Sequence, residues 1–454
     1  MLQIKKKIKN AITDYLGYGL YKNSKIEIEL NKYFQISDPL KRYESAMKLV
    51  QEYPEDPRSY NVLLNIEHYL GKKNQFNSFN KFNQVRNTYL KNSGLNELNF
   101  DMIPSNTIAG AFGNYYTLET LINNRQDNLK KILVILSEDE KITNKALFKY
   151  FEKEIVLIKD TSLSRIQKTL ELPIGVCIPT NKNCLYLDLA ANFSEHQNLI
   201  NKKNNFLKLT NEDVEIGNKY LKKCGINKND WFVTLHVRET TKTDSVKYDE
   251  GFRNSNPHNY LESIKYIIKN GGYVFRMGDK YTSKLENING LIDYAHSEDK
   301  NENLDIFLGA MSKFCIGTSS GYFRVPRYFG VPVLLTNQPQ TIEYFSLKTK
   351  DMFLPKRILD LKNNKTVNLL DSFKFPFSFF SSLHRFNKTD FGQLENTPSE
   401  ILDSVIKMLN KSFSEKINSN FPKYLKSNLQ QDHLIYGDYQ GEPFAEISEK
   451  MIDK

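Results

Sequence analysis

Short apolar runs alternate with stretches of helical spacing through the middle of the chain. Such runs, typical of buried strands, occupy Lys131–Leu136, Ile155–Ile158, Trp231–Val237, Tyr273–Arg276, Leu291–Tyr294, Phe314–Ile316 and Val331–Leu335. Helices are expected between them. One is opened by Pro257, which suits a first helical turn, and ended by Gly271 and Gly272. Strands that alternate with helices predict right-handed crossovers and an α/β fold with a parallel sheet.

The chain is too long for one ordinary core, since it has 454 residues. We predict a helical N-terminal extension over 1–95, a first Rossmann-like α/β domain over 96–222 and a second over 223–360. The remaining residues, 361–454, are aromatic and polar, and we expect them to form a partly helical tail that crosses back to the first domain.

The extension contains two patterns of its own. Between 38 and 90, a helix, an Asp-Pro turn at Pro57 and a second helix ending at Gly71 resemble a single tetratricopeptide-like unit. Repeats of this kind need about three copies to bury a core, so a helical pair packed on the next domain is expected. Residues 1–30 have the spacing of a basic amphipathic helix, which suits either docking on its own protein or contact with an anionic membrane.

Composition narrows the class of protein. Apolar residues make up 40% of the chain, which favours packed cores, and the net charge of +10 favours an anionic small molecule or membrane surface as partner. No nucleic-acid signature accompanies the charge, so no nucleic-acid partner is expected. The four cysteines are scattered, and we expect no metal site. Without a signal peptide or membrane-span pattern, we expect a cytoplasmic protein with peripheral contact at the inner membrane face.

Polar residues gather where three of the expected strands end. Arg238 and Arg276 each end or follow a strand, and Gly278 comes shortly after the second. A small-residue turn follows the third strand, and it comprises Gly317, Thr318, Ser319, Ser320 and Gly321. In an open α/β sheet, ligands bind outside the carboxyl ends of the strands. Arginines and a turn that opens a helix suit a diphosphate there, although Ser and Thr are also ordinary helix caps.

The residues beside Arg238 are candidates for catalysis. Strand alternation places His236 and Arg238 on one side, where His236 could orient the diphosphate or the acceptor. Glu239 is a candidate general base, unless it only neutralises Arg238. Arg253 and Asn254 are candidate contacts to a sugar or phosphate. Gly110 marks a further ligand-facing turn, whose spacing differs from the dinucleotide fingerprint.

Several catalytic motifs are missing from the sequence. It has no P-loop, no nucleophile elbow, no kinase motif set and no Asp-x-Asp clamp for a metal-bound diphosphate. An enzyme that releases a diphosphate would therefore rely on arginines and a helix dipole. We expect no cofactor besides the nucleotide-sugar substrate itself.

The segment from 225 to 340 resembles the donor-binding half of GT-B glycosyltransferases. More narrowly, it resembles a poorly characterised bacterial family that is distantly similar to GDP-fucose-dependent fucosyltransferases. In the latter, a His-x-Arg motif at a strand end binds the nucleotide diphosphate, and Leu235–Arg238 matches it. An Asp in a helix and a Ser-rich turn match Asp305 and Ser319–Gly321. A second arginine usually follows the first, and here Glu239 stands in its place, so a GDP-fucose donor is not predicted.

The resemblance implies two Rossmann-like domains that face a cleft, the GT-B arrangement. It also implies transfer of a sugar from a nucleoside-diphosphate donor to a hydroxyl of a glycan, lipid-linked or protein acceptor in bacterial surface glycan assembly. Two alternatives remain open at the level of sequence. One is a non-catalytic nucleotide- or glycan-binding module, and the other is a sugar-nucleotide epimerase on the same scaffold.

Overall fold

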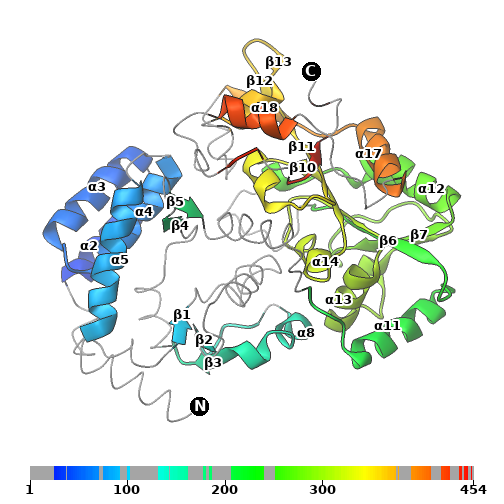
Figure 1. Ribbon diagram of the computed structural model, residues 1–454, viewed down its shortest axis with the longest axis horizontal. Helices are drawn as coiled ribbons and strands as arrows, with labels where there is room; N and C mark the ends of the chain where they lie inside the picture. Colours follow the sequence, from blue (N-terminus) through cyan, green and yellow to red (C-terminus); the bar gives the residue numbers. More distant parts are fainter. Residues whose placement is uncertain are drawn as a thin grey trace.

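The computed structural model describes residues 25–36, 38–70, 75–92, 100–102, 131–142, 144–161, 177–179, 184–186, 206–239, 251–374, 377, 390–410, 421–429, 439–441, 444–447 and 451. Across these residues the chain runs from a group of helices through a small sheet into a larger one (Figure 1). The expected basic helix lies mostly before residue 25, outside the described residues. Among the helices that are described, none is long and apolar enough to cross a bilayer.

The described residues of the extension form four helices: α2 (Lys25–Gln35), α3 (Pro39–Glu52), α4 (Pro57–Leu70) and α5 (Gln75–Asn92). The expected helical hairpin is confirmed as α3 and α4. Asp38 begins α3, because its Oδ1 accepts hydrogen bonds from the backbone N–H groups of Leu40 and Lys41. A separate small core, which includes Leu30, Ala46 and Leu49, holds α2, α3 and α4 together.

A parallel three-stranded sheet comes next in the chain. Its strands are β1 (Phe100–Met102), β2 (Lys131–Leu136) and β3 (Ile155–Lys159), in the order β1-β2-β3. Short helical segments α8 (Lys145–Phe148) and η4 (Glu152–Glu154) connect β2 to β3. A separate antiparallel pair consists of β4 (Cys177–Pro179) and β5 (Cys184–Tyr186).

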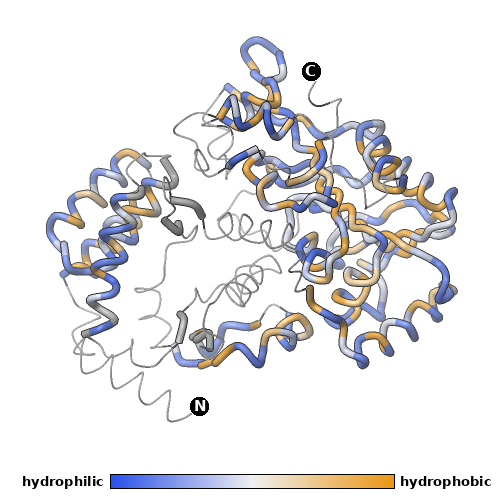
Figure 2. The backbone as a smooth tube through the Cα atoms, viewed as in Figure 1, coloured by the Kyte–Doolittle hydropathy of each residue, from blue (hydrophilic) through white to orange (hydrophobic). Residues whose placement is uncertain are grey.

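The larger sheet has seven strands in the order β15-β11-β10-β9-β6-β7-β8, and every neighbouring pair is parallel. The strands are β6 (Trp231–His236), β7 (Gly272–Met277), β8 (Leu291–Ile292), β9 (Cys315–Gly317), β10 (Val333–Gln338), β11 (Met352–Pro355) and β15 (Glu446–Ile447). The predicted α/β class with a parallel sheet is thereby confirmed. Figure 2 shows these strands as largely hydrophobic, as a sheet covered on both faces requires.

Helices cover both faces of this sheet. In Figure 1, α12 and α17 lie on one side of β6 and β7, and α11 and α13 lie on the other. The helices of this part are α11 (Asn211–Lys223), α12 (Leu261–Lys269), α13 (Glu302–Met311), α14 (Arg324–Tyr328), α15 (Leu369–Ser372), α17 (Pro398–Asn410) and α18 (Phe421–Asn428). Short 3₁₀ helices are η5 (Gly251–Arg253), η6 (Pro257–Tyr260), η7 (Tyr294–His296) and η8 (Thr341–Ser346).

The described residues of the tail pack on the larger sheet and its helices. β15 pairs with β11, and α17 packs on α12, so both belong to the larger sheet. A small antiparallel sheet joins β12 (Arg357–Asp360) to β13 (Lys365–Thr366) and β14 (Phe391–Leu394). A return of the tail to the first domain stays a prediction, as do the domain boundaries.

The two sheets are joined through α8, which packs on α13. Glu302 Oε2, at the start of α13, accepts a hydrogen bond of 2.7 Å from the backbone N–H of Lys145. Asp213 in α11 binds the Lys149 ammonium at 2.5 Å and also accepts from the hydroxyl of Tyr150. One continuous core therefore extends from the smaller sheet into the larger one.

The contact between α11 and α13 depends on the absence of a side chain at Gly217. A Cβ atom built there would overlap the ring of Phe307 in α13. We expect Gly217→Ala to lower the free energy of unfolding by about 1–3 kcal/mol, because overpacking outweighs the gain in helix propensity of about 1 kcal/mol. Chemical denaturation measures the change, with Asn218→Ala on the exposed face of α11 as control. A gain in stability for Gly217→Ala would contradict this packing.

Candidate functional site

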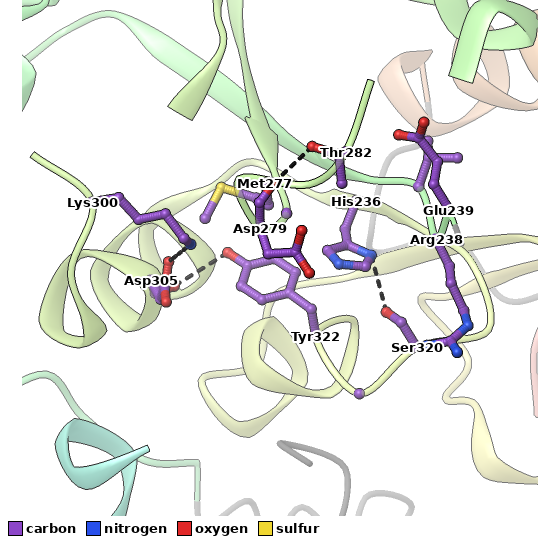
Figure 3. A pocket seen from close by; sticks show the side chains of 13 residues that line it. His236, Arg238, Glu239, Met277, Asp279, Thr282, Lys300, Asp305, Ser320 and Tyr322 are labelled. Carbon is purple, nitrogen blue, oxygen red and sulfur yellow. Dashed lines mark hydrogen bonds and ion pairs between the residues drawn. The ribbon is translucent and has the colours of Figure 1, made fainter. Parts of the chain in front are cut away.

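The carboxyl ends of β6, β7 and β9 meet at one edge of the larger sheet. His236 lies opposite Met277 of β7 on one side and opposite Gly317 of β9 on the other. The segments that follow these strands therefore surround a cavity of about 270 Å³ (Figure 3). Its lining residues are His236, Val237, Arg238, Glu239, Met277, Gly278, Asp279, Thr282, Lys300, Asp305, Ser320, Gly321 and Tyr322.

One side of the cavity is built by His236, Arg238 and Ser320. The hydroxyl of Ser320 lies 3.0 Å from His236 Nδ1, and the imidazole stacks on the ring of Tyr322 at 5.5 Å between centroids. Figure 3 shows the Arg238 side chain running toward Ser320. A guanidinium, a hydroxyl and an imidazole that converge in this way are groups that bind phosphate oxygens.

The small-residue turn after β9 is tied to the strand ends by its own side chains. Thr318 is fully buried, and its Oγ1 accepts a hydrogen bond of 2.8 Å from the backbone N–H of Arg238. Gly317 is required by space, because a Cβ there would lie 2.7 Å from Cβ of Phe323. Thr318 thus fixes the start of the Arg238 segment and does not line the cavity, in contrast to Ser320.

The helix expected to open directly at this turn begins later and is short. α14 starts at Arg324 and has five residues, because Gly321 and Tyr322 accept turn hydrogen bonds from Arg324 and Val325 before regular helix begins. A helix this short adds little dipole at the turn. The polar and positively charged groups on this side of the cavity therefore come from side chains more than from a helix end.

Arg253 and Asn254 precede η6 and do not line the cavity, although Arg253 contacts the small-residue turn beside it. Arg253 Nε donates to the carbonyl and hydroxyl oxygens of Ser319 at 3.0 and 3.1 Å. The buried Lys356 ammonium donates to the carbonyl oxygens of Phe252 and Asn254 at 3.0 and 2.6 Å. Burial lowers the pKa of Lys356. The segment is therefore held from one side by Lys356 and from the other by the small-residue turn.

Arg276 and Glu239 form an ion pair, and of the two only Glu239 lines the cavity. The Arg276 side chain is 2% exposed, and its Nη2 lies 2.8 Å from Glu239 Oε1. The second oxygen of Glu239 accepts from the backbone N–H and the hydroxyl of Ser283 at 3.1 and 2.5 Å. Contact of Arg276 with a diphosphate and base catalysis by Glu239 stay predictions, and these contacts favour a different role for both.

Lys300 and Tyr322 are cavity residues that the sequence did not point to, and Asp305 was indicated only by the family resemblance. Lys300 Nζ lies 3.0 Å from Asp305 Oδ1, and the hydroxyl of Tyr322 donates to the backbone carbonyl of Asp305 at 3.2 Å. Burial raises the pKa of Asp305, and Lys300 opposes that shift. A lysine just before a helix has no local signal that separates it from a surface residue.

Two other expectations concern Gly110 and the binding of a metal ion. Gly110 lies outside the described residues. Within the residues that the structure does describe, no three His, Cys, Asp or Glu side chains are grouped so as to hold a metal ion.

Comparison with known proteins finds no matching family model and no matching curated protein. One similar solved structure is the ADP-heptose LPS heptosyltransferase II of E. coli. It has 11% identity and a TM-score of 0.39 over 68% of this chain and 98% of its own. Another is a family 9 glycosyl transferase from Veillonella parvula, with 11% identity and a TM-score of 0.35 over 56% of this chain and 85% of its own. Similarity at this level leaves function to be argued from the chain itself.

The state of His236 gives a direct test of the cavity's electrostatics. Loss of hydration lowers its pKa to about 4, and Lys300 and Arg238 add to the effect. A bound anion favours the protonated ring, so we expect pyrophosphate to raise this pKa. NMR titration of the His236 ring, with and without pyrophosphate, measures both values, and His258 serves as internal control. A midpoint near 6.5 in the free protein would contradict this loss of hydration.

Proposed function

We propose that this protein is a glycosyltransferase that moves a sugar from a nucleoside-diphosphate donor to a hydroxyl acceptor. The observation that carries the proposal is the convergence of Arg238, His236 and Ser320 in a cavity at the carboxyl edge of a parallel sheet. Such an edge is where open α/β sheets bind ligands. The resemblance of Leu235–Arg238 to a diphosphate-binding motif points to the same group of ligands.

The chemistry of transfer demands that negative charge on the departing diphosphate be stabilised. A guanidinium stays charged at every physiological pH and can donate two parallel hydrogen bonds to phosphate oxygens. Ser320 adds a hydroxyl, and the neutral ring of His236 can donate one N–H. We propose that these groups stabilise the leaving diphosphate without a metal ion.

The acceptor hydroxyl must also lose a proton, and the structure limits which residues can act as the general base. Both oxygens of Glu239 already accept hydrogen bonds, and a ring with a pKa of about 4 is a weak base at neutral pH. Catalysis by His236 and Glu239 therefore stays a prediction. Transfer to a bacterial surface glycan or glycoconjugate, on a GT-B arrangement of two domains, is proposed from the family resemblance.

The proposal predicts that Arg238→Ala weakens binding of a nucleoside diphosphate while the fold stays intact. Loss of a charge-assisted contact costs about 1.5–3 kcal/mol, or roughly 10- to 150-fold in Kd. Thermal-shift and calorimetric titrations with ADP, GDP, UDP, CDP and their sugars measure it, with and without EDTA. Lys265→Ala, which removes an exposed cation on α12, is the control.

The outcomes separate the candidate functions. A selective shift that survives EDTA and is lost in Arg238→Ala supports metal-independent donor binding. Unchanged binding in Arg238→Ala would overturn the proposal. Incubation with the sugar nucleotide alone tests for an epimerase, because that reaction needs no acceptor. Tight binding without transfer to any member of a broad acceptor panel would favour a binding module.

A further inference from the structure

A closed circuit of hydrogen bonds lies beside the cavity and includes Arg276 of β7. Arg276 contacts Glu239 at 2.8 Å through Nη2 and Asp293 at 3.5 Å through Nη1. Asp293 Oδ2 lies 2.9 Å from Nδ1 of His296. His296 Nε2 in turn donates to the backbone carbonyl of Thr282 at 3.0 Å, since a carbonyl oxygen can only accept.

Glu239 completes the circuit by binding Ser283, the residue that follows Thr282. Its Oε2 accepts from both the backbone N–H and the hydroxyl of Ser283. Thr282 and Ser283 are adjacent in the chain, so the circuit holds one short loop through two neighbouring residues. This loop follows Gly278 and extends from Asp279 to Ser283.

The loop itself is compact. Asp279 Oδ1 accepts from the N–H of Tyr281 at 2.8 Å, and the Asp279 carbonyl accepts from the hydroxyl of Thr282 at 2.8 Å. Gly278 enters the loop with φ of +152°, and a Cβ there would lie 3.1 Å from Cγ2 of Thr282. A side chain at Gly278 would therefore disturb both the backbone and the loop packing.

Burial decides what Arg276 does in this arrangement. Its guanidinium is almost completely removed from solvent, and a buried charge is tolerated only when it is paired and hydrogen-bonded. Two carboxylates, Glu239 and Asp293, meet that requirement. Among the described residues that line the cavity, Asp279 and Thr282 of the loop are present and Arg276 is absent.

Adjacent residues after β6 thus serve different sides of the cavity. Figure 3 shows Arg238 directed toward Ser320, whereas the Glu239 carboxylate points away from it. Lys300 and Asp305 lie across the cavity from Arg238, and Asp279 lies between them and His236 in the same view. Asp279 of the loop thus lines the cavity on the far side of His236 from Arg238.

We propose that Arg276, Glu239, Asp293 and His296 are positioning residues, which hold the Asp279–Ser283 loop as the wall that a nucleoside contacts. This inference rests on the proposed binding of a nucleoside diphosphate. Through the loop, Arg276 and Glu239 then affect binding of the nucleoside part of the ligand, whereas Arg238 binds its phosphate.

The test compares a complete nucleotide with its anionic part alone. The probes are inorganic pyrophosphate and whichever of ADP, GDP, UDP and CDP binds the wild-type chain most tightly. Glu239→Gln keeps the size of the side chain but no longer neutralises Arg276, and Ser283→Ala removes one hydroxyl only. Glu286→Gln is the matched control, because its 2.7 Å ion pair with Lys265 is exposed.

We expect Glu239→Gln to raise the Kd of the nucleotide about tenfold while the Kd of pyrophosphate stays within about twofold. Ser283→Ala should give a smaller change of the same kind, and Glu286→Gln should change neither. Arg238→Ala should weaken both probes. Equal weakening of nucleotide and pyrophosphate by Glu239→Gln, or no weakening of either, would overturn the proposal.

Hydrogen exchange of the ligand-free protein tests the loop without any nucleotide. Amides over 279–283 should exchange about tenfold faster in Glu239→Gln and remain unchanged in Glu286→Gln. If Glu239→Gln does not fold, Ser283→Ala carries both measurements. A wild-type chain that binds none of the nucleotides contradicts the proposed function, whereas unchanged exchange of the loop contradicts the positioning role.

Discussion

The pairing of β6 with β7 on one side and β9 on the other is the constraint on which the site depends. Leu235 lies opposite Arg276 and Ile316, and its burial sets the register of all three strands. A shift of β6 by one residue would turn Leu235 to the other face of the sheet and exchange the directions of Arg238 and Glu239. The same apolar contacts that form the core therefore set the directions of the Arg238 and Glu239 side chains.

A buried polar network carries this constraint to the next strand. Thr336 of β10 donates to the carbonyl of Gly317 at 3.0 Å and lies 2.7 Å from the hydroxyl of Tyr260. Asn337 adopts a positive φ of 51° and exchanges two 2.6 Å hydrogen bonds with Asn396. A non-glycine residue held there costs about 1 kcal/mol or more, so its partners must fix it firmly. The base of the small-residue turn is thereby rigid.

Local patterns predicted the elements well and the contacts between them poorly. β2 and the hairpin of α3 and α4 follow directly from apolar spacing, and β6 and β7 differ from expectation by only a residue or so. Arg276 reads in the sequence as a ligand contact, because any arginine at a strand end does. Its partners lie 37 and 17 residues away, so only the folded chain shows that its charge is already matched. Lys300 fails in the opposite sense, since its place in the cavity depends on where α13 packs.

The pairing of charges also makes the cavity positive near one residue and negative near another. Of the charged residues that line it within the described chain, Glu239 is balanced by Arg276, and Asp305 by Lys300. The charged groups that then set the local charge of the cavity are the Arg238 guanidinium and the exposed Asp279 carboxylate. An anion is attracted toward the first and repelled by the second, whereas a hydroxyl or amine donor suits the carboxylate. A ligand with one anionic and one neutral hydrogen-bonding part would bind here in a single orientation.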